Sequence, residues 1–254
     1  MKLSESLKKQ NILRLSTVIS FLFFVNIVFA QSSGIQGSRT TPVVANPQSI
    51  QLTDPGFPLI FEENMDDISL LESQGWIFYD EDGLGLTTYF QGNESVLNSF
   101  NGANNSYLGQ NYNGAFNGGA LIDQWLITPI IHSIGSTTFS FMASSVVSPF
   151  ADHFQIYYSP NGSSDLSKFV LLRNRTEIAD GWSQYSETVE SNGSVRFAIR
   201  YHETDGGPLG TNSDYWGLDN VQVYGTPFSV PISFWWVFSA VILIILGIVI
   251  RKFF

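Results

Sequence analysis

The chain of 254 residues contains no cysteine. This absence excludes a disulfide framework, thiolate zinc sites and a cysteine nucleophile. Histidine is scarce too, and its three residues show no zinc-like spacing. No G-x-S-x-G turn is present, and no motif places a base beside a serine. We therefore expect a protein that is not an enzyme, and whose core is stable alone or is stapled by a group other than a disulfide.

Positive charge is also scarce in the middle of the chain. Of the 12 Lys and Arg residues, four lie in the first 30 positions and two in the last four. None lies between Arg39 and Lys168, whereas 21 of the 22 acidic residues lie between positions 31 and 230. Such a chain disfavours nucleic acid as a partner, because phosphate binding needs a basic face. Acidity favours cations as partners, although net charge also serves solubility.

Residues 1–30 predict a secretory signal peptide. Four basic residues come first, and the apolar run ISFLFFVNIVFA follows them. Val28 and Ala30 then occupy the −3 and −1 positions before a cut at Gln31. An uncleaved N-terminal anchor is the alternative, but this run is shorter than the ~20 residues that a membrane span needs.

Residues 227–254 predict a C-terminal membrane anchor. Positions 232–250 form a run of 19 residues without a charge, long enough to cross a hydrocarbon core of ~30 Å. Trp235 and Trp236 lie near one end, and Arg251 and Lys252 close the other, inner end. We expect an exported chain at the cell surface with a single membrane pass. A buried core helix is the alternative interpretation of this run.

Between these ends the pattern is that of a β protein. Residues 31–56 are rich in Ser, Thr, Gln and Pro and predict a linker or entry arm. Residues 57–226 show short apolar runs broken by turn residues, and the clearest is VRFAIRY. The predicted strands are 58–65, 76–79, 121–127, 137–143, 152–159, 168–173, 195–201 and 216–224. Together they indicate one all-β domain, an antiparallel jelly-roll β-sandwich.

Asparagine and glycine dominate residues 92–119, where aromatic residues are interspersed. This composition predicts a long surface loop or several short hairpins. The aromatic side chains either stack on a partner or cover the edge of the sandwich.

Four acidic residues occupy positions that the period of 2 assigns to the buried face of a strand. They are Glu63, Asp123, Asp152 and Asp219, each flanked two residues away by large apolar residues. An unpaired buried carboxylate is costly, so each needs compensation. Structural calcium, which takes 6 to 8 oxygen ligands, is one solution, and Glu63 and Asp219 are its natural pair. Hydrogen bonds from main-chain N–H groups at strand ends are the alternative.

Several of these stretches resemble a known family. FEENMDD, DQWLITPII, PFADHFQIYYS and YWGLDNVQVYG occur in the order seen in the choice-of-anchor J domain, which belongs with the cleaved-adhesin modules of gingipain-type surface proteins and is similar to MAM domains. The resemblance covers residues 57–226. It implies a jelly-roll sandwich, often calcium-bearing, that serves adhesion on bacterial surfaces. By position, Glu63, Asp152 and Asp219 match the acidic residues that the resemblance implies lie near the metal ion of the family.

The functional expectation is therefore a membrane-tethered, adhesin-type binding module. Its partner is a protein or glycan of a host or neighbouring cell surface. Two alternatives remain: a carbohydrate-binding module whose aromatic rings stack on sugars, and a surface-coat spacer without a specific ligand. Trp76, Trp182 and Trp216 are the tryptophans open to a sugar-stacking role, but their pattern favours the core for each.

Overall fold

The computed structural model describes residues 37–40, 52–83, 89–115 and 119–228, and the predicted signal peptide and membrane anchor lie outside these ranges. Within them no helix is long and apolar enough to cross a membrane. The described strands are β1 (Leu59–Glu63), β2 (Ile77–Asp80), β3 (Phe90–Gln91), β4 (Leu108–Asn111), β5 (Ala120–Ile127), β6 (Ile131–Ser145), β7 (His153–Ser159), β8 (Val170–Glu177), β9 (Ser183–Gly206) and β10 (Tyr215–Pro227). Four short 3-10 helices accompany them: η1 (Ile68–Leu70), η2 (Glu72–Gln74), η3 (Tyr112–Gly114) and η4 (Leu166–Lys168).

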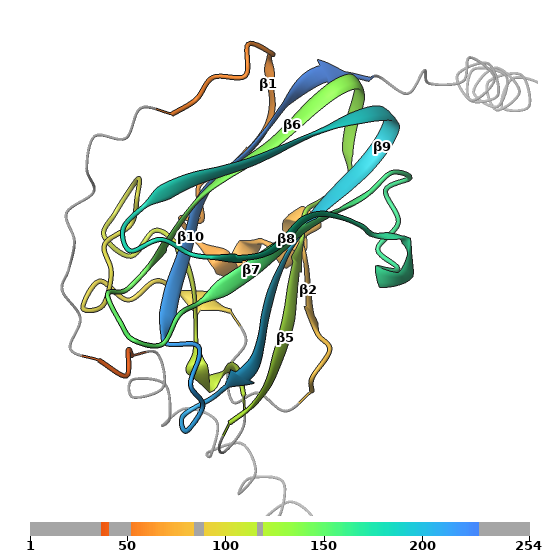
Figure 1. Cartoon of the computed structure of the whole chain (residues 1–254). Helices are drawn as coiled ribbons and strands as arrows, with labels where there is room; N and C mark the ends of the chain where they lie inside the picture. Colours follow the sequence, from red (N-terminus) through yellow and green to blue (C-terminus); the bar gives the residue numbers. More distant parts are fainter. Residues whose placement is uncertain (1–36, 41–51, 84–88, 116–118, 229–254) are drawn as a thin grey trace, which may run out of the picture.

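The strands form two facing layers (Figure 1). One layer has the order β3-β4-β10-β6-β9, and β1 also pairs with β10. The other has the order β2-β5-β9-β7-β8. Strand β9 is shared, because residues 183–195 pair with β6 and residues 196–206 pair with β5 and β7. All these pairings are antiparallel, so the predicted all-β, jelly-roll-like sandwich is confirmed at the level of fold class.

The core lies between the two layers, and alternate side chains of β9 point into it. Val195, Phe197 and Tyr201 are fully buried, whereas Arg196 and Arg200 point to the opposite face and are half-buried. The ring of Phe197 stacks on Phe139 of β6 with centroids 4.8 Å apart. This contact joins the two layers, and such buried aromatic area is the main favourable term in folding.

All eight predicted strands have a counterpart in the structure, but two of the observed strands are much longer than the ranges predicted from the sequence. Strand β6 has 15 residues and β9 has 24. Their extensions are rich in Ser, Thr and Glu with few apolar residues, which leaves little periodicity to detect. Main-chain pairing between the two strands, from Ile131↔Val195 to Ala143↔Ser183, sustains the extension.

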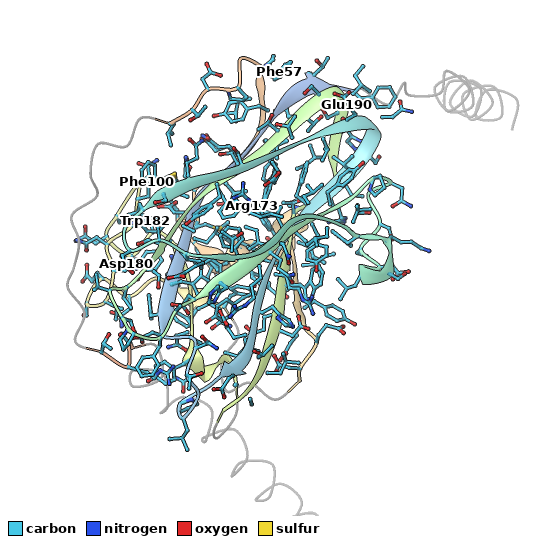
Figure 2. The ribbon with its side chains drawn as sticks, viewed as in Figure 1. Phe57, Phe100, Arg173, Asp180, Trp182 and Glu190 are labelled. Carbon is cyan, nitrogen blue, oxygen red and sulfur yellow. The ribbon has the colours of Figure 1, made fainter. Side chains whose placement is uncertain are left out.

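The Asn/Gly-rich stretch 92–119 contains buried structure, so its prediction as a surface loop is wrong in part. Strand β4 lies between β3 and β10 in the sheet. Tyr107 is fully buried, and its ring lies 6.0 Å from that of Trp182. The reason is close backbone approach: a Cβ added to Gly217 would lie 2.8 Å from the Tyr107 ring. Phe100 also packs on Trp182 (Figure 2), so these aromatics cover the sandwich edge.

Candidate functional site

Asp219 lies where strand β10 changes its neighbour. Tyr215 to Leu218 pair with β4, and Val221 to Tyr224 pair with β1 on the same edge. Between these two ladders the pairing with β6 also shifts, between Asp219 and Gln222. A carboxylate is accommodated here because the neighbouring strand is interrupted and main-chain N–H groups are free to reach it.

The Asp219 carboxylate is fully buried and is compensated by main-chain amides. Its Oδ2 accepts a hydrogen bond from the N–H of Asn101 at 2.9 Å, and its Oδ1 accepts one from Asn220 at 2.6 Å. These contacts bring the Asn/Gly-rich stretch onto β10. Burial still dominates and raises the pKa of Asp219 to about 7, although the amides oppose the shift.

Two further acids, Glu63 and Asp66, lie at the end of β1 and just after it. Glu63 pairs with Val221 across the β1–β10 ladder, and its side chain accepts from the N–H of Met65 at 3.1 Å. Burial raises the pKa of Glu63, and the negative charge of Asp66 adds to the shift at both Glu63 and Asp219. The adjacent Asn64 carries a buried Oδ1 without a hydrogen-bond partner. Carboxylate and amide oxygens therefore belong to the residues on either strand of the β1–β10 junction.

The backbone beside these acids adopts an unusual conformation. Met65 has φ of 55° and Asn220 has φ of 49°, and both are non-glycine residues in the left-handed region. Within the described ranges only Ser213 shares this property. Such conformations cost free energy and persist where the surroundings enforce them.

Asp152 and Asp123 lie elsewhere and have other partners. Asp152 accepts hydrogen bonds from the hydroxyls of Tyr201 at 2.6 Å and Ser145 at 2.8 Å, and burial raises its pKa to about 7. Asp123 accepts from Arg200 Nε at 2.6 Å, and a second bond joins Asp123 Oδ2 to Arg200 Nη2. The structure thus places only Glu63 and Asp219 at one junction.

No group of three His, Cys, Asp or Glu side chains able to hold a metal occurs in the part of the chain that the structure describes. Calcium at Glu63 and Asp219 would therefore need further oxygens from the Asn64 amide, main-chain carbonyls and water. Those are ordinary calcium ligands, and the buried, unpartnered oxygen of Asn64 fits such a donor set. The calcium expectation stays a prediction.

A second feature is an open hollow beside the edge strand β2. It has a volume of about 300 Å³ and is lined by Ile68, Ser69, Glu72, Phe78 and Tyr89. The rings of Phe78 and Tyr89 lie 5.5 Å apart with an interplanar angle of 44° and form its apolar wall. The hollow thus combines aromatic faces with one carboxylate and one hydroxyl, a composition typical of small-molecule sites.

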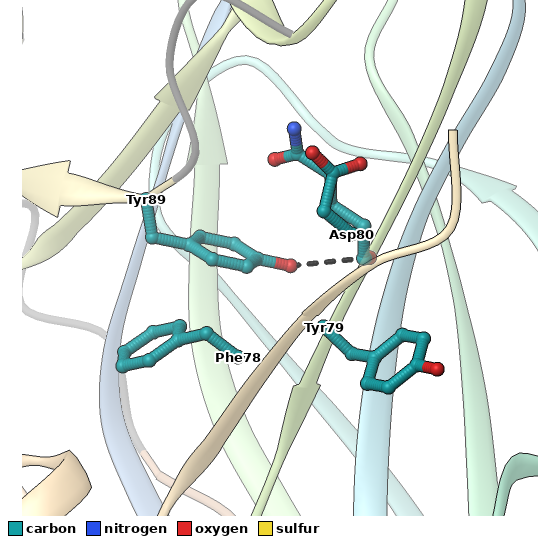
Figure 3. Close-up of a pocket in the computed structure, with 5 residues that line it drawn as sticks. Phe78, Tyr79, Asp80 and Tyr89 are labelled. Carbon is teal, nitrogen blue, oxygen red and sulfur yellow. Dashed lines mark hydrogen bonds between the residues drawn. The ribbon is translucent and has the colours of Figure 1, made fainter. Parts of the chain in front are cut away.

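Phe78 and Tyr89 also line a smaller pocket of about 50 Å³ (Figure 3). Its polar lining comes from Asp80 and Gln124. The hydroxyl of Tyr89 donates to the main-chain carbonyl of Gln124 at 3.2 Å, shown dashed in Figure 3. Burial raises the pKa of Tyr89 well above its usual value, so the phenol stays protonated and keeps this bond. The bond fixes the Tyr89 ring in place.

The tryptophans of the domain do not offer sugar-stacking faces. Trp76, Trp182 and Trp216 are buried, which confirms their expected place in the core. Trp125 lies in a separate apolar cluster and is covered by Tyr157 and Phe169, with centroids at 4.6 and 6.1 Å.

Sequence reasoning missed Phe78 and Tyr89. Phe78 shares a strand face with Trp76, and that pattern indicates core. Tyr89 follows a stretch without a clear period, so nothing marked it as part of a site.

Comparison with known proteins gives structural neighbours only. No family model matches the chain, and no curated protein matches it significantly. Among solved structures, the K1 cleaved adhesin domain of Lys-gingipain from Porphyromonas gingivalis W83 is 18% identical. The match covers 65% of this chain and 98% of that domain, with a TM-score of 0.49.

A xylan-binding domain is also similar: the CBM22-1 domain of Paenibacillus barcinonensis Xyn10C is 8% identical. That match covers 70% of this chain and all of the domain (100%), with a TM-score of 0.42. Both TM-scores lie below 0.5, so the function of this chain has to follow from its own residues.

The raised pKa of Asp219 predicts a pH-dependent stability. Between pH 4 and about 7 the folded state holds a proton on Asp219 that the unfolded state has lost, so this group stabilises the fold at low pH and ceases to as pH rises through 7. We expect the stability of the wild type to fall relative to Asp219→Asn over this window, as measured by urea unfolding in the presence of a chelator.

Asp165→Asn is the matched control, because this exposed acid has its pKa lowered by Ser167 and titrates below the window. Parallel stability curves for the wild type and Asp219→Asn would contradict the assigned protonation.

Proposed function

We propose that this chain is a non-catalytic, surface-tethered binding module of adhesin type that holds a glycan in the Phe78–Tyr89 hollow. The observation that carries the proposal is the hollow itself, whose apolar wall consists of two fixed aromatic rings. Aromatic faces stack on the C–H faces of sugar rings, while Glu72 and Ser69 supply acceptors and a hydroxyl for the sugar hydroxyls. Binding of this kind requires no catalytic group.

The dimensions of the site favour a glycan over a folded protein partner. A stable protein interface buries on the order of 1,200–2,000 Å², most of it on a broad and fairly flat surface. The hollow of about 300 Å³ has the size of a small-ligand site. A surface-coat spacer, the remaining alternative, would need no such hollow.

The acidic lining also selects among glycans. Glu72 lines the hollow, and Asp80 lines the smaller pocket that shares Phe78 and Tyr89 with it. Neither pocket has a Lys or Arg in its lining. Anionic sugars would be repelled, so we infer that the ligand is a neutral glycan.

Structural calcium beside the β1–β10 junction belongs to the proposal. It is supported by the carboxylates of Glu63 and Asp219, by the unpartnered oxygen of Asn64, and by the left-handed backbone at Met65 and Asn220. The ion would join the first strand of the domain to the last, a role that a disulfide serves in other exported proteins. The carboxylate of Asp219 would then remain ionised.

Tethering through residues 227–254 is the other part of the proposal. It rests on the uncharged run at 232–250 and on the basic residues that follow it. The domain would be presented outside the cell on the last strand, β10, which ends at Pro227.

Replacing Phe78 by alanine should weaken glycan binding about tenfold, the equivalent of ~1.4 kcal/mol, because one stacking face is lost. The measurement is binding of the full chain in detergent to a glycan array, followed by calorimetry on the best neutral glycan. Phe57→Ala is the matched control, since this exposed phenylalanine lies outside both pockets (Figure 2). Equal loss in both variants, or binding restricted to sialylated glycans, would overturn the assignment.

Calcium should raise the melting temperature of the wild type by about 5–10 °C at a hundred times its dissociation constant. The Asp219→Asn variant should show little or no shift, because a ligand with a full charge is lost. Differential scanning calorimetry with calcium and with chelator measures both. A wild type that melts at the same temperature in the two buffers removes calcium from the proposal.

Cutting the chain after Gly225 should release the domain from membranes. Cells that express the full chain and the shortened chain are fractionated, and each chain is detected by antibody. The full chain is expected in the membrane pellet and the shortened chain in the soluble exported fraction. A shortened chain that still sediments with membranes would show that residues 226–254 are not the anchor.

A further inference from the structure

A short segment from the predicted entry arm docks on the sandwich, at the end where β9 turns into β10. Residues 37–40 lie beside this turn (Figure 1), and Gly37 accepts a hydrogen bond from the side chain of Asn111 at 3.1 Å. Neither the hollow nor the acidic junction includes these residues. Arg39 is the only basic residue between positions 15 and 167, so its environment is distinctive.

The guanidinium group of Arg39 is enclosed by main-chain oxygens. Its two terminal nitrogens donate to five carbonyl groups, those of Gly207, Pro208, Gly210, Asn212 and Ser213. Its central carbon lies 3.7 Å from the centroid of the Phe150 ring and 5.3 Å from that of Tyr112. A planar cation over aromatic faces and within carbonyls matches guanidinium better than ammonium.

The carboxylate of Asp214 binds the main chain of Arg39 and the side chains of the residues on either side of it. Asp214 accepts from the hydroxyl of Ser38 at 2.9 Å, from the N–H of Arg39 at 2.6 Å, and from the hydroxyl of Thr40 at 3.0 Å. Asp214 is fully buried. Recognition therefore extends over a Ser-Arg-Thr segment. We name the carbonyls of residues 207–213, the Asp214 carboxylate and the Phe150 ring the guanidinium cage.

The guanidinium cage is held in shape by bonds that do not involve the arm. The side chain of Asp205 accepts from both the N–H and the hydroxyl of Thr211, at 3.0 and 2.6 Å. The N–H of Asn212 donates to the carbonyl of Asp205, and that of Ser213 donates to Ala151. Position 210 must be glycine, because an added Cβ would lie 2.2 Å from the Asp205 carbonyl. A site with its own scaffold is pre-organised for a ligand.

The cage satisfies the terminal nitrogens of the Arg39 guanidinium but not its Nε. Its Nε is buried but has no hydrogen-bond partner. Residues 37–40 are only half-buried, and this segment, which bends at Gly37, Arg39 and Thr40, lies on the surface of the sandwich. The contacts of the arm are made by three consecutive side chains and do not belong to any strand pairing.

We propose that the guanidinium cage is a binding site for a short arginine-bearing peptide, filled in cis by the chain's own residues 37–40. The ligand class is a short segment in which arginine is flanked by hydroxyl residues. The arm competes with any such peptide in trans at the high effective concentration that a short linker gives. Removing the Arg39 side chain frees the carbonyls and the Phe150 ring of the cage, and leaves only the contacts of Ser38, Thr40 and the main chain of residue 39 with Asp214 for a peptide to displace.

The test uses the full chain in detergent and the fluorescein-labelled peptide QGSRTT, the sequence of residues 36–41. Arg39→Ala should bind the peptide, as measured by fluorescence anisotropy, at least about tenfold more tightly than the wild type, whose cage is occupied. The peptide QGSATT should not bind, and QGSKTT should bind about tenfold more weakly, because lysine lacks the planar fork. Phe150→Ala in the Arg39→Ala background should weaken binding of QGSRTT.

Circular dichroism establishes folding before each titration. If Arg39→Ala does not fold, Arg39→Lys replaces it, since lysine keeps the charge but leaves most of the carbonyls without a partner. A folded variant that does not bind QGSRTT, or binds QGSATT equally, overturns the proposal and leaves Arg39 as an intramolecular anchor only. Glycan binding through Phe78 is independent of this result.

Discussion

The fold depends on how buried carboxylates are compensated in a chain with few cations and no cysteine. Five acids are buried in the described part of the domain, and they are compensated in four ways. Asp219 uses main-chain amides, and Asp152 uses hydroxyls, whereas Asp123 and Glu203 use arginines. Asp214 is satisfied by the arm. Removing any one partner would strand a buried charge, which costs far more than the pair itself contributes.

Because cations are few in this chain, each arginine of the domain is engaged in an intramolecular ion pair or hydrogen bond. Arg173, Arg175 and Arg200 pair with Glu187, Glu203 and Asp123. Arg196 donates to the carbonyls of Gly162 and Thr128, and Arg39 donates to those of the guanidinium cage. The described pockets are therefore left with aromatic and acidic linings, and this charge pattern makes a neutral ligand the natural choice for the hollow.

The sequence predicted the sandwich because alternation survives in strands with one buried face. VRFAIRY in β9 shows this, since its apolar and arginine residues fall on opposite faces as expected. Strand β4 was missed because Gly109 and Asn111 have low strand propensity, and β3 because it has only two residues. The place of β4 is fixed by the aromatic rings that lie against its glycine. The sequence showed that four acids occupy positions expected to be buried, but the alternation of side chains along a strand does not predict their hydrogen-bond partners. Only tertiary contacts distinguish the amides at Asp219 from the arginine at Asp123.

Arg39 escaped prediction because its segment has the composition of a linker, although its isolation as a basic residue was visible. Strand β10 begins at Tyr215, directly after Asp214 of the cage, and ends at Pro227, from which the chain continues toward the proposed anchor. Thirteen residues of strand span ~40 Å. The guanidinium cage thus lies at the end of β10 opposite to Pro227. If the proposed anchor holds the chain after Pro227, the arginine site would face away from the membrane, where a peptide in solution or on another cell could reach it.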